Sequence, residues 1–214
     1  MRNLTAGEMC AQVYSISNDT KKRISNIVLM GCGEPLDNFE STLRFVKLIT
    51  HPEGLNIGQR HITISTCGLV PEILALAEEK LQITLAISLH APTDDIRQKL
   101  MPIAKRYSVA DTIAACKEYE KITKRRITFE YALALGINDS PSQAKQLAAL
   151  LRGINCHVNL IPVNAARGST HGSDKKATDA FANILQDNRI QTTIRRSLGG
   201  DIQGACGQLR ASQT

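Results

Sequence analysis

Short apolar runs alternate with amphipathic stretches along the chain, and these two patterns predict alternating strands and helices. Runs rich in β-branched residues predict strands at residues 27–30, 61–66, 84–89, 127–133, 158–163 and 190–194. Helical spacing of apolar positions predicts helices at residues 5–16, 39–49, 71–76, 109–119, 141–151 and 177–185. Thr5 and Glu8 form a capping-box pattern at the first helix, and Pro71 marks another helix start.

This alternation predicts an α/β fold with a parallel sheet covered by helices. Five or six such units fit a partial (β/α)6 TIM-like barrel better than an open sheet. The chain opens with a helix, so we expect the barrel to be missing its first strand. The strand that would have been its neighbour then has an exposed edge, which favours association. No repeat or linker divides residues 1–214, which we interpret as one domain.

The composition is that of an ordinary globular protein, with 43% hydrophobic and 21% charged residues, which excludes collagen, coiled coil and wholesale disorder. No apolar run approaches the roughly 20 residues of a membrane span, and residues 1–5 lack a hydrophobic signal region. We therefore expect a cytosolic (cytoplasmic) protein with no membrane partner. The six cysteines are too scattered for a local zinc or iron–sulfur motif and are expected to be reduced.

The charge balance, 26 Lys+Arg against 20 Asp+Glu, permits an RNA or phosphate partner without demanding one. Basic residues cluster at positions 21–23, 124–126 and 195–196. These clusters are either contact points for RNA or solvated loops and helix ends. Aromatic residues make up only 4%, with no Trp, which argues against a stacking platform for single strands.

Small and polar residues follow four predicted strands, at positions 31–35, 65–68, 88–92 and 162–164. Since the carboxyl ends of parallel strands meet at one edge, these residues predict a ligand-binding rim. Glu34, the serine hydroxyls and an amide would suit an ammonium group and a ribose. The structural alternatives are a glycine turn at 31–33, helix caps for Ser65 and Ser88, a core role for His90 and a turn role for Asn164.

Cys206 lies between glycines in the segment GACGQL (204–209), which lets a backbone approach closely and leaves its thiol unshielded. The nearby residues Arg195, Arg196 and Arg210 would favour the thiolate. The alternative is a small buried apolar residue.

The chain resembles the radical SAM adenine-C2 RNA methyltransferases (RlmN type), which are related to the Cfr-type adenine-C8 enzymes. The matching motifs run in family order along the whole chain: RNLT (2–5), MGCGEPLDN (30–38), HITISTCGLVP (61–71), ISLHAP (87–92), ITFEY (127–131), INDSP (137–141), VNLIPVN (158–164) and GACGQL (204–209). Of these, ITFEY favours the C2 branch.

The resemblance implies a set of S-adenosylmethionine contacts: Gly33, Glu34, Ser65, Ser88, Leu89, His90 and Asn164. It implies that Cys206 carries the methyl group, that 23S rRNA and tRNA are the RNA partners, and that flavodoxin or ferredoxin supplies electrons. In the family, the CxxxCxxC loop that holds a [4Fe-4S] cluster precedes the RNLT motif, and here only Met1 does. We therefore expect the cluster ligands, a second essential cysteine, a general-base glutamate and an N-terminal accessory domain to be absent. No metal ligand is assigned, and the chain alone is expected to be inactive.

The implied chemistry explains why a cysteine is needed. Adenine C2 is electron-poor and does not attack a sulfonium methyl, whereas a thiolate does. A radical generated from a second S-adenosylmethionine would then activate the methyl on Cys206 for addition to C2. The target base must leave its stack, and a basic rim would hold the RNA backbone.

Three other hypotheses remain. The chain is a non-catalytic module that binds S-adenosylmethionine or RNA, a C8-specific methyltransferase, or an aldolase-like barrel. The last ranks lowest because no lysine stands at the four strand ends.

Overall fold

Six parallel strands form one sheet in the order β1-β2-β3-β4-β5-β6 in the computed structural model, which describes residues 2–31, 33–162 and 172–195. The strands are β1 (Ile27–Leu29), β2 (Ile62–Thr66), β3 (Thr84–Ser88), β4 (Ile127–Leu133), β5 (Cys156–Pro162) and β6 (Gln191–Ile194). The α-helices are α1 (Ala6–Thr20), α2 (Phe39–Ile49), α3 (Val70–Glu78), α4 (Asp94–Leu100), α5 (Val109–Thr123), α6 (Pro141–Leu150) and α7 (Lys175–Asp187). Three short 3-10 helices are η1 (Pro35–Asn38), η2 (Gln59–His61) and η3 (Pro102–Lys105).

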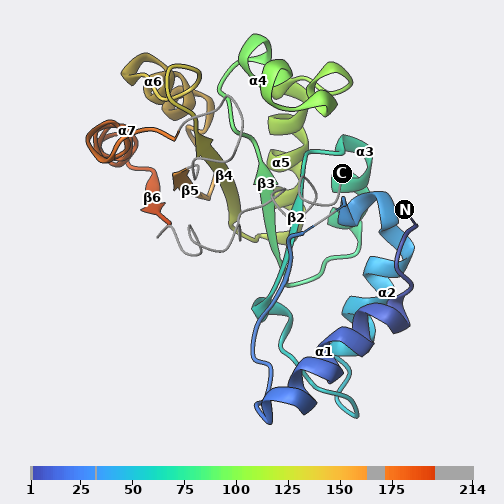
Figure 1. Cartoon of the computed structure of the whole chain (residues 1–214). Helices are drawn as coiled ribbons and strands as arrows, with labels where there is room; N and C mark the ends of the chain where they lie inside the picture. The colour runs from blue at the N-terminus through green and yellow to red at the C-terminus, as the bar shows by residue number, and fades with distance from the viewer. Residues whose placement is uncertain (1, 32, 163–171, 196–214) are drawn as a thin grey trace.

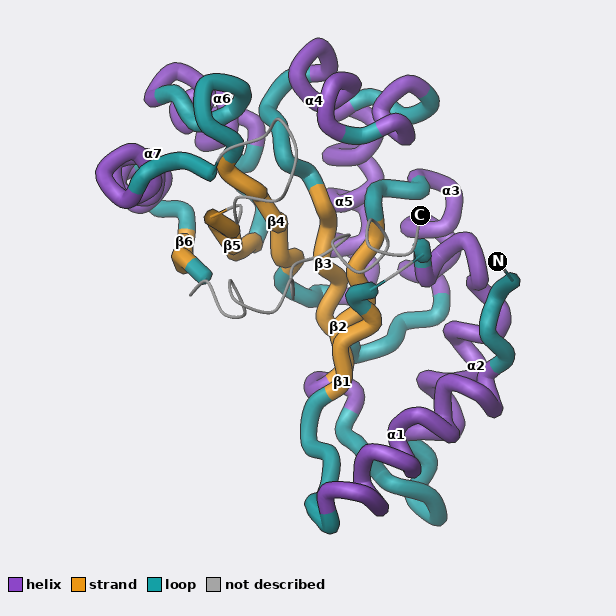
Figure 2. The backbone as a smooth tube through the Cα atoms, in the orientation of Figure 1, coloured by secondary structure: helices purple, strands orange, loops and turns teal. Residues whose placement is uncertain are grey.

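The sheet curves, and the helices form an outer layer around it (Figures 1 and 2). Each strand pairs with the next one along the chain, and the right-handed crossovers of such units place their helices on one side. This arrangement confirms the predicted α/β partial barrel. In the described part of the chain, β1 pairs only with β2, so its other edge is free, as expected for a barrel without its first strand.

The hydrophobic core lies between the sheet and the outer helices. In β2 the buried residues Ile62, Ile64 and Thr66 alternate with partly exposed ones, so Ser65 faces the inner side of the sheet. Tyr131 of β4 packs on Phe181 of α7, with ring centroids 5.1 Å apart. The outer face of the sheet is thus apolar, and polar side chains collect on the inner face.

The predicted strands all form, but four helices extend beyond their predicted bounds: α1, α3, α5 and α7. The capping box of Thr5 and Glu8 starts α1 as expected, yet the helix continues to Thr20. The residues that follow α1 and α5, Lys21 and Lys124, both adopt the left-handed conformation in which glycine or asparagine is usually found. Such lysines leave no stop signal in the sequence.

The sequence pattern missed α4 because this short helix has no apolar stripe. Its buried residue is Arg97, a charged side chain that normally marks an exposed face. Within the described ranges, no helix is long and apolar enough to cross a bilayer.

Candidate functional site: the carboxyl ends of the strands

The predicted site residues that the structure describes follow or end three neighbouring strands. Gly33 and Glu34 come after β1, Ser65 lies in β2, and Ser88 ends β3 and leads into Leu89 and His90. Because β1, β2 and β3 are adjacent and parallel, these residues gather at one edge of the sheet. Asn164 and Cys206 lie outside the described residues.

Glu34 connects the end of β1 to the end of β2. Its Oε1 accepts a hydrogen bond from the backbone N–H of Leu36, 3.0 Å away, and so caps η1. Its Oε2 accepts one from the backbone N–H of Cys67, at 2.7 Å. These two bonds fix the carboxylate in place, and each oxygen keeps a lone pair for a further donor.

Ser65 and Ser88 have hydroxyls that are available to a ligand. Within the described ranges neither hydroxyl forms a hydrogen bond, and neither serine is a helix cap, since the residues before α3 and α4 are Leu69 and Thr93. Ser65 is in register with Ala86, two residues before Ser88, so both serines face the inner side of the sheet. The capping interpretation of these serines is therefore wrong.

Gly33 gives the site open space. Its φ of +103° lies in the left-handed region, and a Cβ built on it would meet nothing within 4 Å. Glycine is therefore needed here for backbone conformation, and its surface can be approached closely.

His90 is held in a strained conformation, with a φ of +59°. Its backbone N–H donates to the Glu130 carbonyl at 3.3 Å, and its Nδ1 accepts from the Ala132 N–H at 3.0 Å. The ring hydrogen therefore sits on Nε2. Burial, together with the charge of Arg97, lowers the pKa of His90 to about 4, so the ring is neutral near pH 7.

Leu89 contributes through packing and its backbone. Its side chain is fully buried, and its N–H donates to the Glu130 carbonyl at 3.1 Å. Its carbonyl accepts from Arg97 Nε, also at 3.1 Å.

Asn138 lies in the INDSP motif (137–141) and was not predicted as a site residue, but it braces the site. The side chain is fully buried, and its Nδ2 donates to the carbonyls of His90 and Ala132, each at 2.7 Å. Its Oδ1 accepts from the Ala134 N–H at 2.7 Å. The asparagine thus connects the strained turn at His90 to the end of β4.

Glu130 is a second buried polar residue whose place the sequence did not indicate. In the sheet register it stands between Ser88 of β3 and Asn159 of β5. Its Oε1 is buried without a hydrogen-bond partner among the described residues, and Arg195 Nη1 lies 3.7 Å away. Burial raises the pKa of Glu130, whereas Arg195 and then Asn159 act in the opposite direction. Strand alternation places this carboxylate on the inner face, in the same row as Ser88.

The described cysteines do not form a metal-binding group. Burial raises the pKa of Cys67 and Cys116 to about 12 and of Cys156 to about 11, so these thiols are protonated near neutral pH. Across residues 2–31, 33–162 and 172–195, no three His, Cys, Asp or Glu side chains come together. The residues described therefore do not fit an iron–sulfur cluster.

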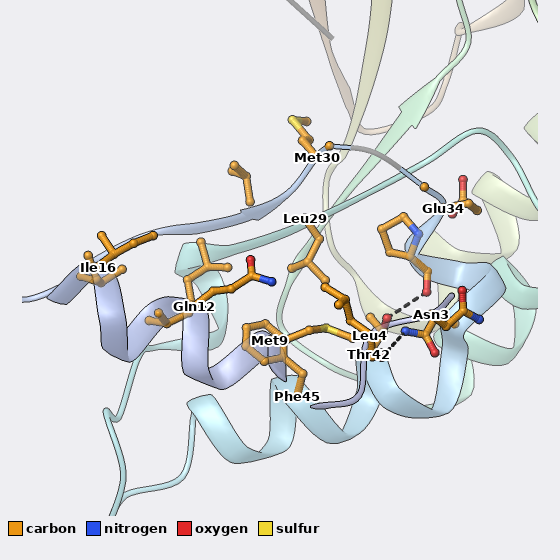
Figure 3. Close-up of a pocket in the computed structure, with 18 of the residues that line it drawn as sticks. Asn3, Leu4, Met9, Gln12, Ile16, Leu29, Met30, Glu34, Thr42 and Phe45 are labelled. Carbon is orange, nitrogen blue, oxygen red and sulfur yellow. Dashed lines mark hydrogen bonds between the residues drawn. The ribbon is translucent and has the colours of Figure 1, made fainter. Parts of the chain in front are cut away.

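A groove of about 700 Å³ runs beside the free edge of β1 (Figure 3). It lies between α1 and β1, with Phe45 of α2 in its lining, and it reaches Gly33 and Glu34. Val28 of β1 also lines it and is 60% exposed. The groove thus joins the edge of β1, which has no other strand beside it among the described residues, to the first part of the site.

Two basic clusters lie away from the site. Residues 21–23 precede β1 and residues 124–126 precede β4, which places both at the amino ends of the strands. Of the third cluster, Arg195 follows β6 at the carboxyl end, and Arg196 lies outside the described residues. These first two clusters therefore do not contribute to a rim at the carboxyl ends of the strands.

Comparisons with known proteins agree with this geometry. The sequence model of the Radical SAM superfamily matches residues 12–148. The chain is 53% identical to a "Probable dual-specificity RNA methyltransferase RlmN" of Clostridium novyi, over 98% of this chain and 62% of that protein. The protein of the same name in Clostridium tetani is 56% identical, over 98% of this chain and 60% of its own length. A radical SAM methyltransferase from Sphaerobacter thermophilus superposes with a TM-score of 0.93 at 48% identity, covering 97% of this chain and 62% of that one. The chain thus spans about three fifths of the relatives it matches.

Proposed function

Since the chain belongs to the radical SAM superfamily, we propose that it is the S-adenosylmethionine-binding and methyl-carrying core of an RNA adenine-C2 methyltransferase. The observation that carries this proposal is the gathering of Gly33, Glu34, Ser65, Ser88 and His90 at the carboxyl ends of β1, β2 and β3. The names of the relatives that are 53% and 56% identical support the RNA methyltransferase activity.

The residues at this edge fit S-adenosylmethionine. The carboxylate of Glu34 suits the ammonium group, because a charge-assisted hydrogen bond is stronger than a neutral one. The hydroxyls of Ser65 and Ser88, which form no hydrogen bond among the described residues, suit the ribose, and the open surface of Gly33 lets the ligand approach the backbone. The neutral ring of His90 adds no positive charge beside the sulfonium.

We propose that Cys206 is the methyl acceptor, as the family resemblance implies. When bound, S-adenosylmethionine supplies an electrophilic methyl group. The Cys206 thiolate attacks that carbon, a new sulfur–carbon bond forms as the sulfonium–methyl bond breaks, and S-adenosylhomocysteine leaves. Adenine C2 needs such a carrier because it is too electron-poor to attack the methyl itself. The described residues include no group of side chains that could hold an iron–sulfur cluster. Its ligands, like the electron donor, would belong to a longer protein that contains this chain.

Ligand binding by the chain tests the first half of the proposal. We expect isothermal titration calorimetry to detect S-adenosylmethionine binding, and Glu34→Gln to weaken it about tenfold because a charged hydrogen-bond partner is lost. The matched control is Glu53→Gln, at an exposed carboxylate in the turn after α2. Equal binding by Glu34→Gln and the unmodified chain would overturn the assignment of Glu34.

The carrier role of Cys206 is tested in the complete methyltransferase. We expect Cys206→Ala to abolish methylation of RNA adenine while the variant still binds S-adenosylmethionine. Cys10→Ala, in the outer helix α1, is the control and should retain methylation. A methylated adenine produced by the Cys206→Ala protein would refute the carrier role.

A further inference from the structure

Arg97 of α4 is a fully buried cation with no carboxylate within ion-pair distance in the described part of the chain, although the charge of the nearby Asp94 favours its charged form. Its side chain is 0% exposed, and the ion pairs formed among the described residues do not include it. Desolvation lowers its pKa, yet an arginine remains charged at neutral pH. A buried charge is expensive unless its hydrogen bonds are satisfied, so the partners of this guanidinium identify its role.

The hydrogen-bond partners of Arg97 are neutral oxygens, and three belong to the strand ends of the site. Nη2 donates to the carbonyls of Cys67 at 2.7 Å and Ser88 at 3.3 Å, and Nε donates to that of Leu89 at 3.1 Å. On the other side, Nη1 donates to the Tyr107 carbonyl at 3.4 Å and to Thr112 Oγ1 at 3.5 Å. Converging carbonyl oxygens repel one another, and a planar cation with five donors removes that repulsion.

The backbone of Cys67 connects Arg97 to Glu34 through two hydrogen bonds. The carbonyl of Cys67 accepts from Arg97, and its N–H donates to Glu34 Oε2 at 2.7 Å. The next residue, Gly68, has a φ of +101°, and a Cβ on it would lie 3.0 Å from Arg97 Nη2. The turn after β2 is therefore shaped to admit the guanidinium.

We propose that Arg97 is a positioning residue, which sets the carboxyl ends of β2 and β3 and, through the Cys67 peptide, the Glu34 carboxylate for binding S-adenosylmethionine. This proposal rests on the proposed function, since it assumes that these strand ends bind that ligand. A purely structural arginine would affect the stability of the fold and leave the affinity of the folded protein unchanged.

The first test is Arg97→Lys in the 214-residue chain, which keeps the charge and loses the planar fork. We expect the folded variant to bind S-adenosylmethionine about tenfold more weakly by calorimetry, as for the loss of one charged hydrogen bond. The Cys67 amide hydrogen should also exchange faster with solvent. Leu185→Ala, a fully buried residue of α7, is the control: it should lower Tm and leave the affinity unchanged.

If Arg97→Lys does not fold, two threonine variants that should disturb the fold less are compared in its place. Thr112 and Thr178 are both buried helical threonines whose Oγ1 donates to the carbonyl four residues earlier, at 2.9 Å in each case. Thr112 alone also accepts a bond from Arg97. We expect Thr112→Val to weaken binding about threefold, since one neutral acceptor is lost, and Thr178→Val to have no effect on affinity.

The outcomes separate the two proposals. If the unmodified chain does not bind S-adenosylmethionine, the proposed function fails and the role of Arg97 fails with it. If the chain binds and Glu34→Gln weakens it, but the folded Arg97→Lys and Thr112→Val proteins bind normally, only the role of Arg97 is overturned.

Discussion

Replacement of Asn138 by an aspartate tests whether this side chain braces the turn at His90. The change keeps the size and shape of the side chain and converts only the Nδ2 donor into a carboxylate oxygen. That oxygen would face the carbonyls of His90 and Ala132, each 2.7 Å from Nδ2 in the native arrangement. The bond accepted from the Ala134 N–H would remain.

The geometry predicts a loss larger than that of a simple truncation. Asn138→Ala removes three hydrogen bonds, and at about 1 kcal/mol each it should lower the free energy of unfolding by about 3 kcal/mol. Asn138→Asp loses only two of these bonds, but it buries a charge against two carbonyl oxygens. It should therefore lower the free energy of unfolding by at least about 1 kcal/mol more than Asn138→Ala.

Urea unfolding followed by circular dichroism at pH 8 and pH 5 measures this difference. The two carbonyl oxygens would raise the pKa of the new carboxyl group, because only the protonated form donates a hydrogen bond. The Asn138→Asp variant should therefore regain stability relative to Asn138→Ala at pH 5. Asn183→Asp, at an exposed position of α7, is the control and should change little. Equal stability of the Asn138→Asp and Asn138→Ala proteins at pH 8 would refute the bracing role.

Three further expectations concern other residues. Gly33→Ala should lower the free energy of unfolding in urea by about 1–2 kcal/mol, since the φ of Gly33 is +103°. Gly7→Ala inside α1 should raise it by about 0.5–1 kcal/mol. Equal effects of the two substitutions would contradict the argument from backbone conformation. With a His90 pKa of about 4 when folded against about 6.5 when unfolded, falling pH protonates the unfolded chain first, so stability should drop between these values by about 1.4 kcal/mol per pH unit. That component should vanish in His90→Gln, and its persistence would argue against a neutral, buried ring. Iodoacetamide at pH 8 should leave Cys67 and Cys116 unmodified until urea unfolds the chain, because burial keeps both thiols protonated. Mass spectrometry of the native protein measures this modification, and rapid labelling of either cysteine would contradict the expectation.

The sequence predicted the sheet well because each strand carries its own signal. A β-branched run such as residues 62–66 is recognisable without knowledge of its neighbours, and a parallel arrangement follows from the helices between the runs. Glu34, Ser65 and Ser88 could likewise be grouped in advance, since carboxyl ends of parallel strands share one edge.

The residues that support the site could not be predicted in the same way. Arginine usually lies on an exposed face, so its residue type gives no sign that Arg97 is buried. The burial of Arg97 depends on hydrogen bonds to backbone carbonyls from three separate segments. Asn138 is a residue type typical of turns, and it does lie just before Ser140, the N-cap of α6. Its side chain, however, donates a hydrogen bond to the carbonyl of His90, which is distant in the sequence. Such roles come from tertiary contacts that no local pattern encodes.

The consecutive order of the strands has a consequence for how the chain opens. Every pairing joins segments separated by a single crossover, so the sheet can grow or fray one unit at a time from either end. β1 has three residues and, in the described part, one neighbour, so we expect its backbone amides to exchange with solvent sooner than those of β3 and β4. If the detachment of β1 also breaks the bond between the Cys67 N–H and Glu34 Oε2, Glu34 leaves with β1, while His90 stays anchored between β3 and β4. The ligand-binding edge would therefore lose its acidic end first and keep its histidine.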